Sequence, residues 1–302
     1  MQFNNILLTG INGQVGYELQ SSLATLGKVH ALDRSQLDLT NPDQIRSVVR
    51  SIKPDLIVNP AAYTAVDKAE TEAELAYAIN ATAPQIMAEE ASKLGAFMLH
   101  YSTDYVYDGS KLSPYVESDS INPLSVYGKS KLAGEEAIRA SGVSHIILRT
   151  SWVYGARGKN FLKTMIRLAT ERDQLKVVAD QVGAPTTSNA IAAATRQLLQ
   201  NYKTDNDGVY HFTCTGSTSW HGFAQAILEE FDLLASEKGW PPLKVHASDI
   251  IPITTADYPT PAARPANSRL DCSLLKQKLG VALPDWRVAL RQVIQELEVS
   301  ST

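Results

Sequence analysis

The sequence predicts an α/β fold: a Rossmann-type, doubly wound parallel sheet with a smaller, discontinuous C-terminal domain. Over residues 6–150, short apolar runs alternate with segments of helical periodicity, which is the pattern of successive βαβ units. The first apolar run, residues 6–9, leads into a glycine-rich turn at residues 10–16 and then into a helical segment. A strand, a glycine turn and a helix in this order are typical of the start of a dinucleotide-binding unit.

Length and composition exclude several classes of protein. The chain has 302 residues, and 44% of them are hydrophobic, which is enough for one large domain or two moderate ones. The formal net charge is −4 and no basic block is present, so nucleic acid is not an expected partner. No run of about 18 apolar residues occurs, so no membrane span is expected.

The N-terminus and the cysteines indicate a cytoplasmic protein. Residues 1–5 contain no basic stretch and run directly into the first strand, which argues against a signal peptide. The two cysteines, Cys214 and Cys272, lack metal-ligand spacing and fit a reducing compartment. The sequence does not determine the oligomeric state, and a homodimer stays open.

The elements of the first half follow from periodicity and boundary residues. Residues 17–26 place Leu19, Leu23 and Leu26 on one helical face. Asn41 and Pro42 suit the cap and first turn of the next helix. We further expect helices at 66–80, 84–94 and 126–140, strands at 6–9, 29–32, 55–59, 97–102 and 145–149, and a long loop at 108–123.

The second half is less regular. Helical periodicity predicts helices at 160–171, 190–200, 223–234, 271–279 and 286–297, and short apolar runs predict strands at 175–178 and 209–212. We therefore expect residues 1–150 to form the dinucleotide-binding domain and residues 151–302 to form mainly a substrate domain. The segments near 175–212 are expected to return to the first sheet.

The glycine turn and the second strand predict where a dinucleotide lies. Gly10, Gly13 and Gly16 let the backbone turn tightly and approach a pyrophosphate at the helix N-terminus. Asp33 and Arg34 end the second strand, where the adenosine ribose would lie. Asp33 could accept from a 2′-hydroxyl, favouring NAD, and Arg34 could pair with a 2′-phosphate, favouring NADP. The sequence therefore leaves the choice between NAD and NADP open.

A tyrosine and a lysine predict acid–base chemistry. Tyr127 and Lys131 are four residues apart, so a helix places both side chains on one face. A nearby ammonium would lower the tyrosine pKa from about 10, so that the phenol can donate a proton to a carbonyl oxygen. The strand at 97–102 delivers Thr103 to the same sheet edge. Alone, this tyrosine–lysine spacing is common in surface helices.

In combination, these motifs resemble the extended short-chain dehydrogenases/reductases and, more closely, the dTDP-4-dehydrorhamnose reductases. The resemblance covers nearly the whole chain and rests on residues 6–16, 58–70, 101–109, 126–131, 149–155, 180–186 and 264–271. It implies that NADH or NADPH supplies a hydride to reduce the 4-keto group of dTDP-4-dehydro-L-rhamnose, giving dTDP-L-rhamnose. It also implies an association with Mg²⁺, for which the spacing indicates no ligands.

The resemblance also implies roles for individual residues. Tyr127 would donate a proton to O4 of the sugar, Lys131 would lower its pKa and bind the nicotinamide ribose, and Thr103 would bind the carbonyl. The other cofactor contacts that it implies are Gly10, Gly13, Gln14, Val15, Ala61, Ala62, Thr64 and Tyr101. Position in the chain, rather than the resemblance, adds Gly16 in the glycine turn and Asp33, Arg34, Asp38 and Leu39 after the second strand. The other substrate contacts would be Asp104, Trp152, Asn160, Gln181 and Arg264.

Several residues have an alternative structural reading. Asp38 also suits a helix cap, Trp152 a core aromatic and Arg264 a surface ion pair.

Three other functions use the same scaffold. A 4,6-dehydratase is disfavoured because that family carries Glu where this chain has Tyr105. A 4-epimerase or reductase of another nucleotide sugar stays open, as does a non-catalytic NADP-binding regulator resembling the methionine adenosyltransferase beta subunit.

Overall fold

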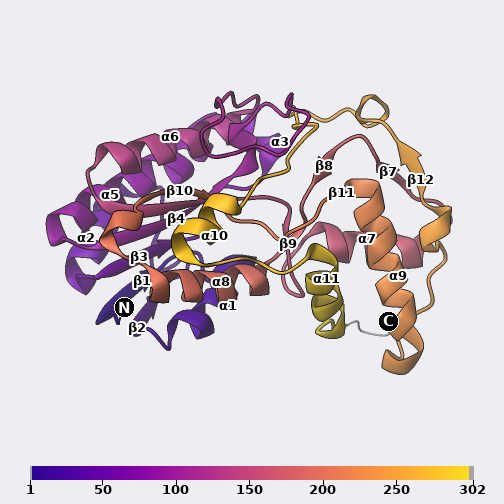
Figure 1. Ribbon diagram of the computed structural model, residues 1–302, viewed down its shortest axis with the longest axis horizontal. Helices are drawn as coiled ribbons and strands as arrows, with labels where there is room; N and C mark the ends of the chain where they lie inside the picture. The colour runs from indigo at the N-terminus through magenta and orange to yellow at the C-terminus, as the bar shows by residue number, and fades with distance from the viewer. Residues whose placement is uncertain (1, 299–302) are drawn as a thin grey trace.

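The computed structural model describes residues 2–298 and is built on a six-stranded sheet (Figure 1). The strand order is β10-β5-β4-β3-β1-β2, and every neighbouring pair is parallel. The order reverses between β1 and β3, which confirms the doubly wound parallel sheet. The strands are β1 Asn5–Leu8, β2 Lys28–Ala31, β3 Leu56–Asn59, β4 Phe97–Thr103, β5 Ser144–Thr150 and β10 Gly208–His211.

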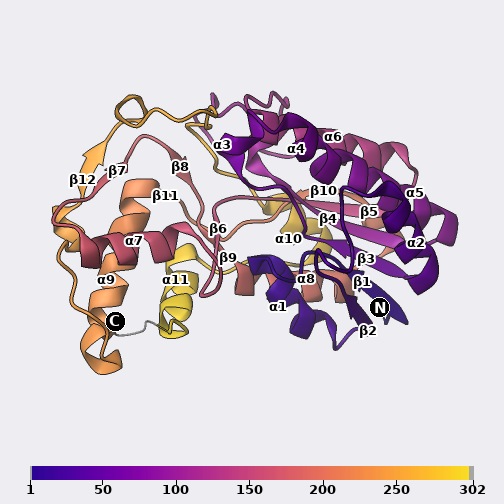
Figure 2. The ribbon, with the colours of Figure 1, turned by 180° about the vertical axis from the view of Figure 1, so that it is seen from behind.

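Helices cover both faces of this sheet (Figures 1 and 2). Side chains alternate between the faces: Ile6 and Leu8 belong to the core that includes α1, whereas Leu7 belongs to the core that includes α2 and α5. A strand buried on both faces reads as a continuous apolar run, which is why β1 was recognisable in the sequence. The helices are α1 Gln14–Leu23 and α8 Ser188–Asn201 on one face, and α2 Pro42–Ile52, α5 Ala83–Leu94 and α6 Val126–Ala140 on the other.

The second part of the molecule lies beyond the carboxyl ends of the strands (Figure 1). Three helices pack together there: α7 Phe161–Glu171, α9 Trp220–Lys238 and α11 Trp286–Gln295. They are joined by the strand pairs β6 Val153–Tyr154 with β9 Thr186–Thr187, β7 Lys176–Val178 with β12 Ile251–Ile253, and β8 Val182–Gly183 with β11 Thr218–Ser219. The short helix α10 Ser273–Leu279 returns to lie beside β10. Four 3₁₀ turns complete the fold: η2 Asp104–Val106, η3 Thr204–Asn206, η4 Ala247–Asp249 and η5 Thr255–Asp257.

The structure differs from the sequence prediction in two segments. The single helix expected at 66–80 is three pieces, namely α3 Val66–Ala69, α4 Ala73–Tyr77 and the π-helix η1 Ala78–Thr82. The hydroxyl of Thr71 donates to the carbonyl of Lys68 and competes with continuation of α3. The strand at 175–178 does not return to the main sheet, because β7 pairs with β12; within residues 175–212 it is β10 that joins the sheet and α8 that packs on its face.

Candidate active site

A cavity of about 800 Å³ lies at the carboxyl ends of β1, β3, β4 and β5, across the point where the strand order reverses. It brings together most of the residues selected from the sequence. The cofactor candidates in its wall are Gly10, Gly13, Gln14, Val15, Gly16, Asp33, Arg34, Asp38, Leu39, Ala61, Ala62, Thr64 and Tyr101. The wall also contains Thr103, Asp104, Tyr127, Lys131 and Trp152.

The glycine turn has the shape needed to hold a pyrophosphate. Gly10 has φ of +62°, and a Cβ there would lie 2.9 Å from Ala61. A Cβ on Gly16 would lie 2.2 Å from the carbonyl oxygen of Gly10, so only glycine allows α1 to start this close to the turn. Gly13 caps α1 without a side-chain hydrogen bond, which leaves the amides of the first turn available to an anion. The residues present therefore fit a dinucleotide.

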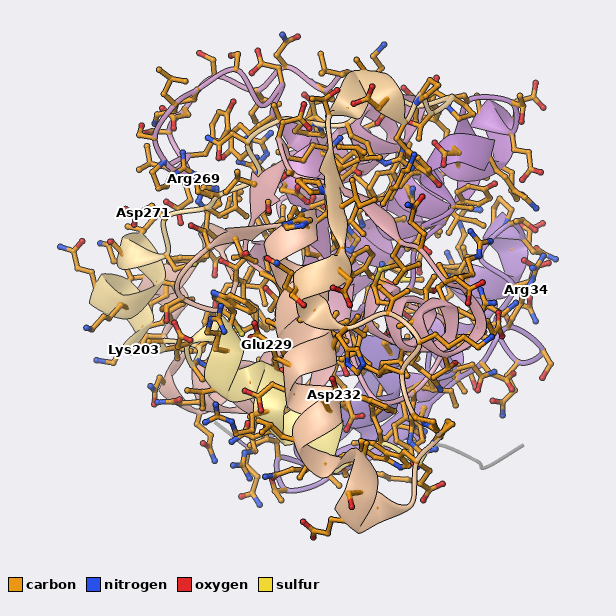
Figure 3. All side chains as sticks on the ribbon, turned by 90° about the vertical axis from the view of Figure 1, so that its right-hand side faces the viewer. Arg34, Lys203, Glu229, Asp232, Arg269 and Asp271 are labelled. Carbon is orange, nitrogen blue, oxygen red and sulfur yellow. The ribbon has the colours of Figure 1, made fainter. Side chains whose placement is uncertain are left out.

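The cavity wall after β2 contains the carboxylates of Asp33 and Asp38 and the guanidinium of Arg34. Asp33 Oδ1 accepts from the amide and hydroxyl of Ser35, and Asp38 Oδ1 accepts from the amide and hydroxyl of Thr40. These hydrogen bonds hold the pKa of both carboxyls below the ordinary range, and they shape the turns around β2 and before α2. Arg34 is exposed, and Figure 3 shows it at the surface of the N-terminal half.

Tyr127 and Lys131 project from the first turns of α6. Ser125 caps this helix, its hydroxyl accepting from the amide of Gly128, which fixes where the helix begins. Lys131 is 1% exposed, and its Nζ donates to the carbonyl oxygen of Tyr101 at 2.6 Å and lies 3.2 Å from Nε2 of His100. Burial lowers the pKa of Lys131 to about 8, although the charge of Glu135 raises it.

The pKa of Tyr127 moves in the direction opposite to the one the sequence predicts. Burial raises it to about 12; a hydrogen bond with Thr103 lowers it, and the charge of Asp104 raises it further. Lys131 is not among the groups that lower this pKa, and its Nζ instead contacts the carbonyl oxygen of Tyr101 and the ring of His100. Tyr127 is therefore protonated at neutral pH, which is the state that a proton donor requires.

Asp104 is a buried carboxyl beside the tyrosine. It is 2% exposed, its Oδ1 accepts from the hydroxyl of Thr103 at 3.0 Å, and its Oδ2 has no hydrogen-bond partner among residues 2–298. Burial raises its pKa to about 6. Tyr105 follows, and its ring meets that of Tyr127 edge-on at 5.4 Å. A carboxyl with an unused oxygen in a cavity wall suits recognition of a hydroxyl group.

Trp152 joins the cavity to the second part of the molecule. It has φ of +49°, a left-handed conformation that bulky residues rarely adopt. Its ring stacks on Trp220 of α9 at 3.6 Å, and a Cβ on Gly183 would lie 2.6 Å from the ring. Trp152 is thus both a packing residue and a cavity-wall residue, which combines the two readings of the sequence.

Three substrate candidates lie outside the cavity wall. Asn160 caps α7 and donates through Nδ2 to Gln14 Oε1 at 2.8 Å. Gln181 is buried and donates to the hydroxyl of Thr255. Arg264 forms an ion pair with Asp67 of α3 at 2.8 Å, and its Nη1 is buried without a hydrogen-bond partner in the described part of the chain. Asn160 and Gln181 therefore support local structure, whereas Arg264 bridges the two parts of the molecule.

The cavity wall also contains residues that sequence reasoning missed. Asn12, Tyr105, Ser151 and Lys159 line it, and the first three lie within the motifs at residues 6–16, 101–109 and 149–155 without having been selected as contacts. Asn12 lies inside the glycine turn, and that position could have predicted that it lines the cavity. Within residues 2–298, no three His, Cys, Asp or Glu side chains gather as metal ligands, so the described residues lend no support to the Mg²⁺ association.

Comparison with known proteins decides the family. The RmlD substrate binding domain family matches residues 4–299. The chain is 48% identical to dTDP-4-dehydrorhamnose reductase of Burkholderia thailandensis, covering 97% of this chain and 98% of that protein. This chain belongs to the RmlD family of dTDP-4-dehydrorhamnose reductases.

Two further relatives agree with this family assignment. The dTDP-4-dehydrorhamnose reductase of Escherichia coli K12 is 46% identical over 97% of this chain and 98% of its own length. The crystal structure of dTDP-4-dehydrorhamnose reductase from Bacillus anthracis, in complex with NADP, matches with a TM-score of 0.87 and 37% identity, covering 98% of this chain and all of that one. None of the helices in the described part of this chain has the length and apolar character that crossing a membrane requires.

Proposed function

We propose that this protein reduces the 4-keto group of dTDP-4-dehydro-L-rhamnose to dTDP-L-rhamnose. The observation that carries the proposal is one cavity that places Thr103, Tyr127 and Lys131 opposite a glycine turn, in a chain of this family. The glycine turn suits a dinucleotide, and the three polar side chains suit a carbonyl that becomes an alkoxide. A bound nicotinamide cofactor supplies the hydride.

Tyr127 is the proton donor in this proposal. Its raised pKa keeps the phenol protonated until negative charge develops on O4 of the sugar. Thr103 shares a hydrogen bond with the tyrosine, and we assign its hydroxyl, which donates to Asp104 Oδ1 in this structure, to donate to the same sugar oxygen when substrate binds. Two donors aimed at one oxygen stabilise the charge of the alkoxide more than that of the ground-state carbonyl, which lowers the barrier.

Lys131 supports the tyrosine after the proton has left. We assign its ammonium, which lies one turn along α6 and is buried, to stabilise the phenolate through charge when bound ligands exclude water from the cavity. The same group can bind a ribose hydroxyl of the cofactor. We retain both NADPH and NADH as cofactors and assign a 2′-phosphate of NADPH to Arg34, which is exposed and lines the cavity.

Three groups are assigned to the nucleotide sugar. Asp104 offers its free Oδ2 to a sugar hydroxyl, and Trp152 gives a flat apolar wall. Arg264 holds an unpaired buried donor at Nη1, and a planar guanidinium suits a diphosphate. Its partner Asp67 keeps it oriented across the two parts of the molecule.

The test is oxidation of reduced cofactor with dTDP-4-dehydro-L-rhamnose generated in the assay. We expect the wild type to consume NADPH or NADH and to form dTDP-L-rhamnose. Tyr127→Phe should lower kcat by about 100-fold or more, the contribution of general acid catalysis, while cofactor affinity stays near the wild-type value. Wild-type turnover by Tyr127→Phe would refute its role. Cofactor binding without turnover by the wild type would favour a regulator or another nucleotide sugar.

A further inference from the structure

Four buried side chains next to the cavity contact one another in series, and the last of them is Lys131. The hydroxyl of Thr9 lies 2.6 Å from Oδ1 of Asn59, whose Nδ2 lies 3.1 Å from Nδ1 of His100. On the other side of the ring, Nε2 of His100 lies 3.2 Å from Nζ of Lys131. All four residues are at most 1% exposed by side-chain and backbone area together. Thr9 and Lys131 both line the cavity, so the series leaves its wall and returns to it.

The hydrogen-bond directions in this series depend on the charge of Lys131. A neutral imidazole carries one proton. When Asn59 accepts from Thr9 through Oδ1 and donates to Nδ1 through Nδ2, the ring proton is on Nε2 and points at Nζ, which must then accept. A neutral amine can accept and an ammonium cannot. If the side-chain amide of Asn59 flips so that Oδ1 and Nδ2 exchange places, His100 Nδ1–H donates to the amide oxygen. His100 Nε2 then accepts from the ammonium of Lys131.

We propose that Asn59 and His100 form a reversible positioning device for Lys131, donating to Nζ when Lys131 is neutral and accepting from it when Lys131 is charged. The two states differ by one bound proton. Charged Lys131 with His100 protonated at Nδ1 becomes neutral Lys131 with His100 protonated at Nε2, and one proton leaves to solvent. Every buried polar atom of the pair keeps a partner in both states, which avoids the cost of an unsatisfied group.

The imidazole itself stays neutral throughout. Burial and the charge of Lys131 hold the pKa of His100 well below its ordinary value. The charged group that acts on Lys131 is Glu135 on α6, which is itself paired with Arg149 on β5, whereas Asp104 on η2 acts on Tyr127. Glu135 favours the charged lysine and burial favours the neutral one, so both states are accessible near neutral pH. Nζ thus keeps its position between the Tyr101 carbonyl and the His100 ring in either charge state. The consequence for catalysis rests on the proposed reduction.

The direct test is ¹⁵N NMR of the wild-type protein labelled at histidine, which reports the protonated ring nitrogen without turnover. The His100 signal is assigned by its loss in His100→Gln. We expect Nδ1–H on the acid side and Nε2–H on the basic side of a midpoint at about pH 8, the pKa of Lys131. Lys131→Met should hold one tautomer throughout. A single tautomer in the wild type across this range, or the same change in Lys131→Met, would overturn the proposal.

A second test uses activity and two substitutions at one position. A glutamine amide can donate or accept by turning over, so His100→Gln should keep kcat within about threefold of the wild type. His100→Leu cannot do either, and its kcat should fall about tenfold, the value of one charge-assisted hydrogen bond. Equal losses in both variants at equal thermal stability would count against the device, as would full activity of His100→Leu. If the wild type does not reduce the sugar, the proposed function fails while the NMR result still decides this inference.

Discussion

Arg149→Met should destabilise this protein more than any surface substitution of the same type. Arg149 and Glu135 are 2% and 0% exposed in their side chains. The guanidinium donates to both carboxylate oxygens, at 3.0 and 2.6 Å, and to the hydroxyl of Tyr107 at 2.8 Å. The pair joins α6 to β5 directly behind the active site.

The size of the loss in unfolding free energy follows from the unpaired carboxylate that Arg149→Met leaves in the core. Without the guanidinium, Glu135 keeps the hydroxyl of Ser102 at 2.5 Å but remains a buried charge. Removing one partner of a buried pair costs about 3–5 kcal/mol of unfolding free energy. Replacing both partners by apolar residues of similar volume removes the stranded charge, so the double variant Glu135→Leu with Arg149→Met should regain most of that loss.

Urea unfolding followed by circular dichroism measures these free energies. Arg167→Met is the matched control, because its ion pair with Glu171 is more than half exposed and should be worth less than about 1 kcal/mol. The reasoning fails if Arg149→Met costs no more than the control, or if the double variant is no more stable than Arg149→Met alone.

Three further predictions follow from the cavity. Arg34→Ala should raise KM for NADPH about tenfold more than KM for NADH in steady-state assays, and equal effects would remove its contact with the 2′-phosphate. Burial raises the pKa of Asp104 from 3.8 to about 6, so the folded state binds its proton more tightly. The stability that Asp104 contributes should therefore fall by about 3 kcal/mol as pH rises from about 4 to about 6, which unfolding titrations would measure as the difference in pH dependence between the wild type and Asp104→Asn. Gly16→Ala places a Cβ 2.2 Å from the Gly10 carbonyl oxygen, so calorimetry should detect strongly weakened cofactor binding; wild-type affinity would contradict the turn geometry.

The sequence by itself determined the scaffold of the site, because those signals are local. The run from Ile6 to Gly16 specifies a buried strand, a tight turn and a helix start within eleven neighbouring residues. The spacing of Tyr127 and Lys131 fixes their common helical face once the helix forms. The alternation of strands and helices predicts the doubly wound sheet, whose right-handed crossovers leave few other topologies.

Only the tertiary structure decided the electrostatics of the site and the partners of its residues. The pKa of Tyr127 depends on how far the folded chain excludes water, and spacing carries no information about that. The contact between His100 and Lys131 joins residues 31 positions apart, and the ion pair of Arg264 with Asp67 joins residues 197 apart. Such contacts form only after strands and helices have packed. The sequence could therefore identify the candidate site residues, whereas tertiary packing determined their charge states and their contacts.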